Sequence, residues 1–376
     1  MTVTGGDSSL LRRLNAAAVL RVLHEAESLT LTQLVRSIGV ARATVENALT
    51  GLVEHSWVEE VAPVTDGARS VGRPAKRYRF RAEAGCVLGF DIGAYKILAV
   101  ITDLKGEVLG SRQTAVTPDL PSAERIAAAR TLGHRTLRGA GLRAADVRAV
   151  GIGTTGIVDS SGVVRLSALL PDWTGVDLVA ALGEPFGAPV VAGNDTNLAA
   201  LGERWRGSAT EARDVLYIHA GRRISAGILI DGRVHAGRHG AAGEIGVLPA
   251  SSWPTAPGRL LGWSGEGQGD AEELFAAVRS ADPRALAALD RYADDLAQGI
   301  AAVVLTFDPE LVVIGGGVSQ AGRLLLDPLR DRLAGQCLFP VEVVTSALGD
   351  RSVALGAARL SLDLVERQLF EVSPRD

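Results

Sequence analysis

The chain has 376 residues, 47% hydrophobic and 22% charged, a balance typical of a globular protein with a substantial core. This length predicts two or three folded units, and no apolar run approaches the roughly 20 residues of a membrane span. There is no signal-peptide pattern, and the two distant cysteines, Cys86 and Cys337, argue against a disulfide framework and a multi-cysteine zinc knuckle. We therefore expect a cytoplasmic protein without a membrane partner.

The net charge of −4 is unevenly distributed along the chain. Residues 1–84 carry 11 Lys/Arg and 9 Asp/Glu, whereas the remainder is acidic. Residues 67–81 contain no acid and six bases, namely Arg69, Arg73, Lys76, Arg77, Arg79 and Arg81. Such a local basic stripe is the electrostatic footprint of an appended DNA-binding module, although a solvated surface strand has the same pattern.

The first 55 residues contain three helical patterns. In the first, four apolar residues share one face: Leu11, Leu14, Ala18 and Val22. Thr30 and Gln33 form a predicted capping box before the second helix, and Gly39 ends that helix. Its apolar stripe consists of Leu31, Leu34, Val35 and Ile38. The third helix is predicted to point four residues inward: Val45, Leu49, Leu52 and Val53.

Two helices joined by a short glycine-containing turn form the helix-turn-helix arrangement, in which the second helix enters the major groove of DNA. The candidate base-reading residues of that helix are Arg42, Thr44, Glu46 and Asn47. Arginine suits a guanine edge or a phosphate, and asparagine suits adenine. Ala41 stands at the expected N-cap, where it supplies no side-chain hydrogen bond.

Alternating residues at 57–61 and 77–80 predict two strands that form a wing. The connecting loop ends in Gly72-Arg73-Pro74-Ala75-Lys76, an extended segment that would carry Arg73 into a narrow minor groove. The candidate DNA contacts of the wing are Arg69, Arg73 and Lys76. The alternative interpretation of residues 1–84 is a small packing or dimerisation module.

The rest of the chain contains an internal repeat. The segments beginning at Val87 and Val215 align with a one-residue gap, so that Gly93 matches Gly221 and Asp91 matches His219. The repeat predicts two related lobes, each beginning with a β-meander. Helical stretches at 122–139, 196–206, 270–280, 284–306, 319–334 and 352–368 alternate with short strands such as 147–153, 188–192 and 311–314. This is an α/β pattern.

Two such lobes describe the actin-like ATPase (ribonuclease H-like) architecture, in which nucleotide and substrate lie between the lobes. Five motifs occur in the order found in the ROK (repressor, open reading frame, kinase) family, which the chain resembles over nearly its whole length. They are Asp91-Ile-Gly93, Gly151 to Asp159, Gly193-Asn194-Asp195 through Glu203, Gly240 to Gly246, and Gly315-Gly316-Gly317-Val318. We expect a winged helix-turn-helix at 1–84 and a kinase-like domain at 85–376. Lobe one would comprise about 85–195 plus the C-terminal helix, and lobe two about 196–350.

The resemblance implies roles for individual residues. Asp195 matches the base that deprotonates the sugar hydroxyl in active kinases, and Asn194 and Glu244 match sugar-binding residues. From the residues alone, Asn194 could also form a strand-end turn, and Glu244 a helix or loop cap. The nucleotide-binding positions correspond to Asp91, Gly93, Gly221, Gly315, Gly316 and Gly317.

The departures from the family pattern argue against catalysis. Tyr95 replaces the threonine of the first phosphate turn, and bulky Arg222 and Arg223 stand in the second. Val247 replaces a histidine of the sugar and zinc site, the cysteine-rich zinc segment is absent, and Leu169 replaces a sugar-loop asparagine. We therefore expect no catalytic residues, Asp195 being a degenerate base, and no zinc or other cofactor; ATP binding is in doubt.

The sequence thus predicts a DNA-binding transcriptional regulator of the repressor type, acting on carbohydrate-related genes. Its expected partners are a double-stranded operator, a sugar or sugar-derived effector, and further copies of itself in a homodimer or homotetramer. Two alternatives remain: a sugar kinase with ATP-dependent phosphotransfer, and a ligand-independent dimerisation scaffold.

Overall fold

The computed structural model describes residues 8–62, 75–248, 251–265 and 271–371. Its N-terminal module contains helices α1 (Ser8–Glu25), α2 (Leu31–Ile38) and α3 (Arg42–Glu54). Strands β1 (Leu29–Thr30), β2 (Val58–Val61) and β3 (Arg77–Phe80) form an antiparallel sheet in the order β1-β3-β2. The three helices and the hairpin confirm the predicted winged helix-turn-helix fold.

The predicted capping box at the start of α2 is present. Thr30 Oγ1 accepts a hydrogen bond from the backbone N–H of Gln33 at 3.3 Å, and Gln33 Oε1 accepts one from the N–H of Thr30 at 2.8 Å. Gly39, with a φ of 77°, closes the helix in the left-handed conformation that favours glycine. Ala41 provides no side-chain hydrogen bond to α3, as its sequence position predicted.

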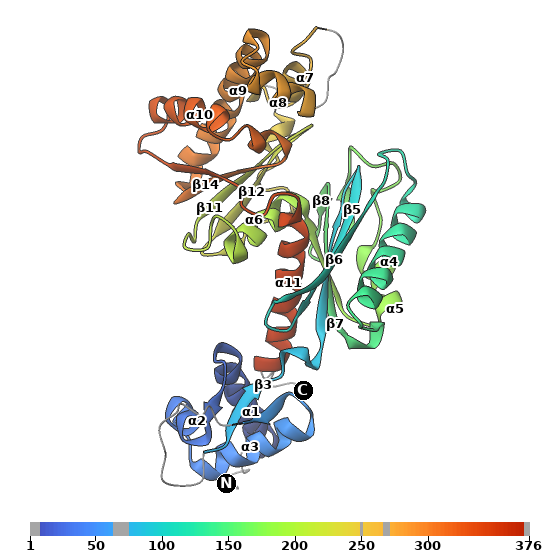
Figure 1. Cartoon of the computed structure of the whole chain (residues 1–376), viewed down its shortest axis with the longest axis vertical. Helices are drawn as coiled ribbons and strands as arrows, with labels where there is room; N and C mark the ends of the chain where they lie inside the picture. Colours follow the sequence, from blue (N-terminus) through green and yellow to red (C-terminus); the bar gives the residue numbers. More distant parts are fainter. Residues whose placement is uncertain (1–7, 63–74, 249–250, 266–270, 372–376) are drawn as a thin grey trace, which may run out of the picture.

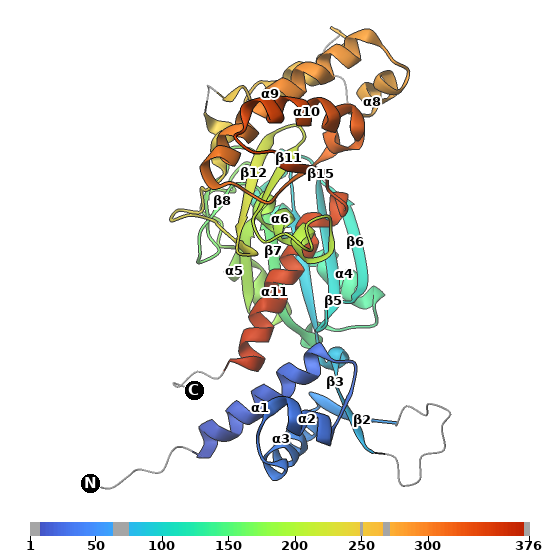
Figure 2. The same ribbon diagram turned by 90° about the vertical axis from the view of Figure 1, so that its left-hand side faces the viewer.

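Two expectations about the helix faces were wrong. Leu11 and Leu14 are 57% and 45% exposed, and α1 instead buries Ala17, Leu20 and Leu23. The N-terminal end of α1 extends beyond α2 and α3, so these two helices do not cover the two leucines (Figure 2). Val53 is 42% exposed because it faces a groove beside α3 and not the interior.

The first lobe is built on a five-stranded sheet of order β10-β7-β4-β5-β6. Its strands are β4 (Cys86–Ile92), β5 (Lys96–Asp103), β6 (Val108–Ala115), β7 (Val147–Thr154) and β10 (Val190–Asn194). Helices α4 (Ser122–Gly139) and α5 (Leu178–Phe186) pack against this sheet, while β8 (Ile157–Val158) and β9 (Val164–Leu166) form a small separate hairpin.

The second lobe repeats this topology, as the internal repeat predicted. Its sheet has the order β13-β12-β11-β14-β15, with strands β11 (Val215–Ala220), β12 (Ile224–Ile230), β13 (Arg233–Val234), β14 (Leu311–Gly315) and β15 (Glu342–Thr345). In each lobe the first strand pairs antiparallel with the second and parallel with a later one. The helices here are α6 (Asp195–Arg206), α7 (Ala256–Leu261), α8 (Ala271–Arg279), α9 (Pro283–Phe307) and α10 (Arg323–Gln336).

The C-terminal helix α11 (Ser352–Phe370) connects the three parts of the chain (Figure 1). It packs against α6, β4 and β7, and its far end reaches α1. One buried cluster contains side chains from the winged helix, the first lobe and α11, namely Leu20, Leu23, Phe80, Val87, Ala149, Leu362 and Val365. This shared core fixes the winged helix on the first lobe and on α11.

Among the described residues, none of the helices combines the length and apolarity required to cross a bilayer.

Candidate functional site

Helix α3 presents the predicted base-reading residues to the outside. Arg42, Glu46 and Asn47 are exposed and Thr44 is half-buried, whereas Val45, Leu49 and Leu52 are buried beneath them. This division follows the helical period, which places residues three and four apart on one face. The four candidates thus lie together at the N-terminal end of the recognition helix.

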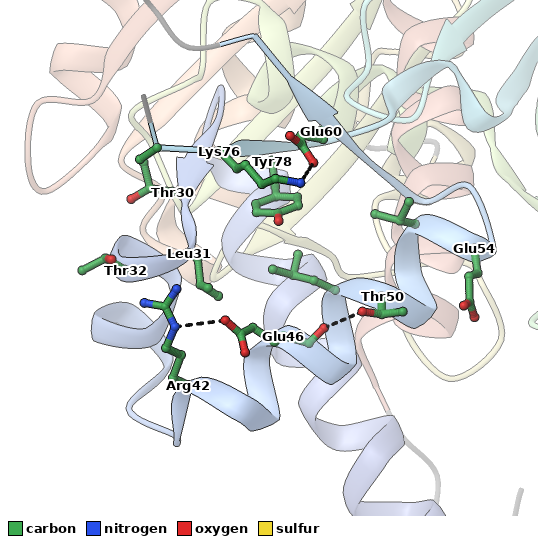
Figure 3. A pocket seen from close by; sticks show the side chains of 13 residues that line it. Thr30, Leu31, Thr32, Arg42, Glu46, Thr50, Glu54, Glu60, Lys76 and Tyr78 are labelled. Atoms are coloured by element: carbon green, nitrogen blue, oxygen red, sulfur yellow. Dashed lines mark hydrogen bonds and ion pairs between the residues drawn. The ribbon is translucent and has the colours of Figure 1, made fainter. Parts of the chain in front are cut away.

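A groove of about 590 Å³ lies between α2, α3 and the base of the wing (Figure 3). Two ion pairs line it: Arg42 Nε to Glu46 Oε1 at 3.0 Å, and Lys76 Nζ to Glu60 Oε2 at 2.7 Å. The other lining residues include Thr30, Leu31, Thr32, Leu49, Thr50, Val53, Glu54, Ala75 and Tyr78. The charged side chains of the groove therefore nearly balance, and the groove is not strongly cationic.

The described part of the basic stripe is largely bonded within the module. Arg77 donates to the Ser28 hydroxyl and carbonyl, and Arg79 donates to Glu59 and Glu83. The hydrogen bond that Arg79 donates to Glu83 raises the pKa of Arg79 above its ordinary value. Arg77 thus attaches the wing to the turn that follows α1, and Arg79 joins β3 to β2 and to the turn after β3. Of the predicted wing contacts, Lys76 lines the groove, while Arg69 and Arg73 lie outside the described residues.

The predicted ligand-binding residues lie where β10 passes into α6. Asn194 is the N-cap of α6: its Oδ1 accepts from the N–H groups of Thr196 and Asn197 at 2.9 and 3.1 Å. Its Nδ2 donates to the Gly156 carbonyl at 3.0 Å. The amide is thus occupied in holding the strand end and the helix start, the alternative that the sequence left open. Asp195 follows as the first residue of α6 and is partly exposed.

The carboxylate of Asp195 affects the pKa of two other carboxyl groups of the candidate site, Asp91 and Glu244. Asp91, at the end of β4, is only 7% exposed, and burial raises its pKa to about 7, with Asp195 adding to the effect and Lys96 opposing it. Burial likewise raises the pKa of Glu244, again with Asp195 adding and with Arg223 opposing. The structure therefore brings Asp91, Asp195 and Glu244 into one electrostatic neighbourhood at the junction of the lobes.

The first family turn is held by an ion pair that sequence reasoning missed. Gly93 N–H donates to the carbonyl of Lys96 at 3.0 Å, which closes the turn between β4 and β5. Lys96 Nζ then lies 3.1 Å from Asp350 Oδ2, just before α11. Asp350 belongs to none of the predicted motifs, so its position beside the turn is known only from the structure.

The second family turn, Gly221-Arg222-Arg223, is filled by side chains. A Cβ atom at Gly221 would lie 2.9 Å from His219 Nε2, so the imidazole occupies the inner side of the turn. Burial lowers the pKa of His219, which favours the neutral ring. At the tip, the Arg222 guanidinium stacks on the Tyr95 ring of the other lobe, with its central carbon 5.1 Å from the ring centre. The two departures from the family pattern therefore contact each other.

The remaining glycine candidates serve the packing of the second lobe. A side chain at Gly315 would place its Cβ 1.9 Å from the Tyr217 hydroxyl, and one at Gly316, whose φ is 79°, would meet the Ala220 carbonyl at 2.5 Å. Gly317 has open space around it and begins a 3-10 turn. Val247, in the position of the family histidine, is 72% exposed. No group of three potential metal ligands occurs within the described ranges.

A second missed residue is Glu203, which is fully buried in α6. Its carboxylate accepts hydrogen bonds from Ser208 N–H at 2.8 Å and from the N–H groups of Ala347 and Leu348 at 3.2 and 3.1 Å. It also accepts from the hydroxyls of Ser208 and Ser346. Glu203 is the last residue of the family motif that begins at Gly193. Its fixed place in that motif, after Asp195, was the only feature of the sequence that pointed to it.

The chain thus combines a winged helix with two lobes of the same topology. This is the architecture of a DNA-binding protein that carries an actin-like ATPase domain. The comparisons agree: residues 87–258 and 261–363 match the ROK family, and residues 14–62 match the IclR helix-turn-helix domain. The chain belongs to the ROK family, and its N-terminal domain is a helix-turn-helix of the IclR type.

Relatives that match nearly the whole chain include the xylose repressor of Caldicellulosiruptor bescii, 24% identical over 93% of this chain and 96% of its own length. The glucokinase of Thermotoga maritima is 33% identical but covers only 54% of this chain, matching 76% of its own length. Among solved structures, a ROK family transcriptional regulator that is a homologue of the E. coli MLC protein has a TM-score of 0.74, 22% identity, and coverage of 96% and 97% of the two chains. A ROK glucokinase from Streptomyces griseus reaches 0.61 at 29% identity, covering 74% of this chain and 100% of its own.

Proposed function

We propose that this chain is a transcriptional repressor that binds a DNA operator and responds to a carbohydrate. In this proposal, the two-lobed domain senses the ligand and does not transfer phosphate. The observation that carries it is the combination of an exposed α3 reading face with filled phosphate turns. The full-length match to a xylose repressor, against a partial match to a glucokinase, supports the same assignment.

The proposed effector site is the group of polar side chains at the lobe junction. Asp195 and Glu244 are the groups proposed to bind sugar hydroxyls, and Asn194 holds the backbone from which Asp195 projects. One oxygen of Asp195, Oδ1, already accepts from the Thr196 N–H at 2.8 Å. Because the Caldicellulosiruptor relative is named for xylose, xylose is the first effector to test, followed by other pentoses and hexoses.

Helix α11 offers the route from this site to the DNA-binding module. At one end, Asp350 binds Lys96 beside the first turn; at the other, Arg21 Nη2 donates to the Phe370 carbonyl at 2.9 Å. His24 lies with its ring 5.3 Å from that of Phe370. A ligand that binds one arrangement of the lobes better than another would thereby shift the position of the winged helix.

We further propose that the active form is a homodimer or a homotetramer in the cytoplasm. Two copies of α3 related by a two-fold axis would read the two halves of a palindromic operator. The wing contacts Arg69, Arg73 and Lys76 would add to the reading of α3 in each half-site. Sedimentation of the protein with and without operator DNA tests this arrangement.

Electrophoretic mobility shifts with DNA from upstream of its own gene test the repressor function. We expect a specific complex whose affinity falls as the salt concentration rises, and whose amount changes when xylose or another sugar is added. The complex should be lost in Asn47→Ala, while a substitution on the far side of the lobes, such as Arg279→Ala, leaves it intact. Binding that shows no sequence preference at any salt concentration would refute the proposal.

The second candidate function is a sugar kinase, favoured by the position of Asp195 at the end of β10 and by the glucokinase relatives. A coupled assay for ADP release across common hexoses and pentoses separates the two functions. Turnover that disappears in Asp195→Asn would establish the kinase.

A further inference from the structure

The recognition helix carries an exposed ion pair at its very start. Arg42 is the first residue of α3, and Glu46 lies one turn later; their side chains are 64% and 49% exposed. Within the described chain, the pair uses only Nε of Arg42 and Oε1 of Glu46. The two terminal amino groups of Arg42 and the second oxygen of Glu46 therefore remain available (Figure 3).

Helix stability does not explain this pair. An exposed pair four residues apart contributes only about 0.3–0.5 kcal/mol, and the favourable orientation places the acid before the base. Here the base comes first, so that a cation stands at the positive end of the helix dipole. The first turn of α3 contains no acid, and Ala41 supplies no cap.

The surface around the pair is also unusual for DNA binding. Three glutamates, Glu46, Glu54 and Glu60, line the groove against two cations, Arg42 and Lys76, and each cation is already paired. Carboxylates repel phosphates, so this face gains little from non-specific attraction. In the major groove, however, a carboxylate has a suitable partner in the N4 amino group of cytosine.

We propose that Arg42 and Glu46 form one reading unit for neighbouring G·C pairs. Arg42 donates to O6 and N7 of a guanine, and Glu46 accepts from N4 of a cytosine. Side chains one helical turn apart are about 5–6 Å apart, a separation that suits adjacent base pairs with a rise of about 3.4 Å. Glu46 also holds the arginine toward base edges and away from phosphates. This inference rests on the proposed DNA-binding function and names the bases that it reads.

The test compares two glutamates on the same side of α3. Glu46→Gln and Glu54→Gln each remove one negative charge from the groove, but only Glu46 is paired with Arg42. Operator sites are first selected from randomised duplexes with the wild-type chain. Affinity is then measured for the selected site and for versions in which single G·C pairs are replaced by A·T.

We expect both variants to bind random DNA more tightly at low salt, because both lose a repulsive charge. Only Glu46→Gln should lose discrimination at one G·C pair, by about tenfold or more. Arg42→Lys keeps the charge but not the two-pronged donor, so it should lose discrimination at the neighbouring pair and retain its affinity for random DNA. Unchanged thermal unfolding confirms that each variant is folded.

The outcomes separate this inference from the proposed function. If the wild-type chain selects no preferred sequence, the DNA-binding function fails, and the inference fails with it. If the chain selects a site but Glu46→Gln keeps full discrimination, or loses it equally with Glu54→Gln, the reading unit is refuted while the repressor function stands.

Discussion

The Arg222 guanidinium of the second lobe stacks on the Tyr95 ring of the first, with 5.1 Å between the guanidinium carbon and the ring centre. Both residues stand in the two turns where the chain departs from the family pattern. Such a stack at an exposed site contributes about 0.5–1 kcal/mol, enough to favour the contact but not to lock the lobes together. Its main consequence is that a side chain from each turn lies between the two lobes.

We accordingly predict that the chain does not respond to nucleotide. Adding Mg-ATP should leave the thermal midpoint unchanged, and no ADP should be released with any common hexose or pentose. The stack and the His219 ring exclude the close backbone approach that phosphates need. A stabilising shift with Mg-ATP that grows when Tyr95 is replaced by threonine would show that the turn still binds phosphate.

A second prediction concerns the pH dependence of stability. Burial raises the pKa of Asp91 to about 7, with Asp195 and Asp350 adding to the effect and Lys96 opposing it. Since an unfolded aspartate titrates near pH 4, the folded chain holds a proton that the unfolded chain releases between about pH 4 and 7. The contribution of Asp91 to the free energy of unfolding therefore falls as the pH rises through this window, and it is level above pH 7.

Asp91→Asn removes this dependence. Relative to wild type, the variant should gain stability between pH 5 and pH 8, by an amount on the order of 3 kcal/mol. Urea unfolding at a series of pH values measures the difference, and Asp331→Asn, on the exposed side of α10, controls for the loss of a charge. A constant difference between Asp91→Asn and wild type across this range would mean that Asp91 is ionised in the folded chain.

The sequence predicted most of the architecture, because its signals are periodic. Apolar spacing located the helices, and the repeat at Val87 and Val215 located both sheets. Helices α5 and α7 were not predicted; they are short, and they contain Pro185 and Pro257, respectively, which usually indicate a break.

The sequence alone could not predict which side chains contact one another in the folded chain. Arg79 counted as a base of the predicted DNA stripe, but folding brings Glu59 and Glu83 to it and neutralises it. Tyr95 and Arg222 were each identified as departures from the family pattern, and only the structure shows that they pack together. Asn194 fits the family motif as a ligand contact, yet its amide is bonded as a helix cap.

A third prediction follows from the buried carboxylate of Glu203. Five donors from residues 208 and 346–348 point at its two oxygens, and these bonds attach the segment before α11 to α6. In Glu203→Gln, one oxygen becomes an amino group that faces donors, which leaves buried N–H groups unpaired. We expect a loss of about 2–3 kcal/mol in the free energy of unfolding, measured in urea. Glu211→Gln, an exposed change just after α6, should have no comparable effect.

The last prediction tests the packing of α11, the helix that joins the sensor to the winged helix. A Cβ at Gly356 would lie 1.7 Å from the Leu198 carbonyl oxygen of α6, a contact that backbone movement alone could relieve. Gly356→Ala should therefore destabilise the chain by about 3 kcal/mol or more.

Gly335, near the end of α10, provides the matched control, because a Cβ there meets nothing within 4 Å. Gly335→Ala should gain up to about 1 kcal/mol from the higher helix propensity of alanine. The same substitution thus changes the urea midpoint in opposite directions at the two positions. If Gly356→Ala unfolded at the wild-type midpoint, α11 and α6 could not be in backbone contact. The rigid connection from Asp350 at the lobe junction to Phe370 beside His24 would then lose its basis.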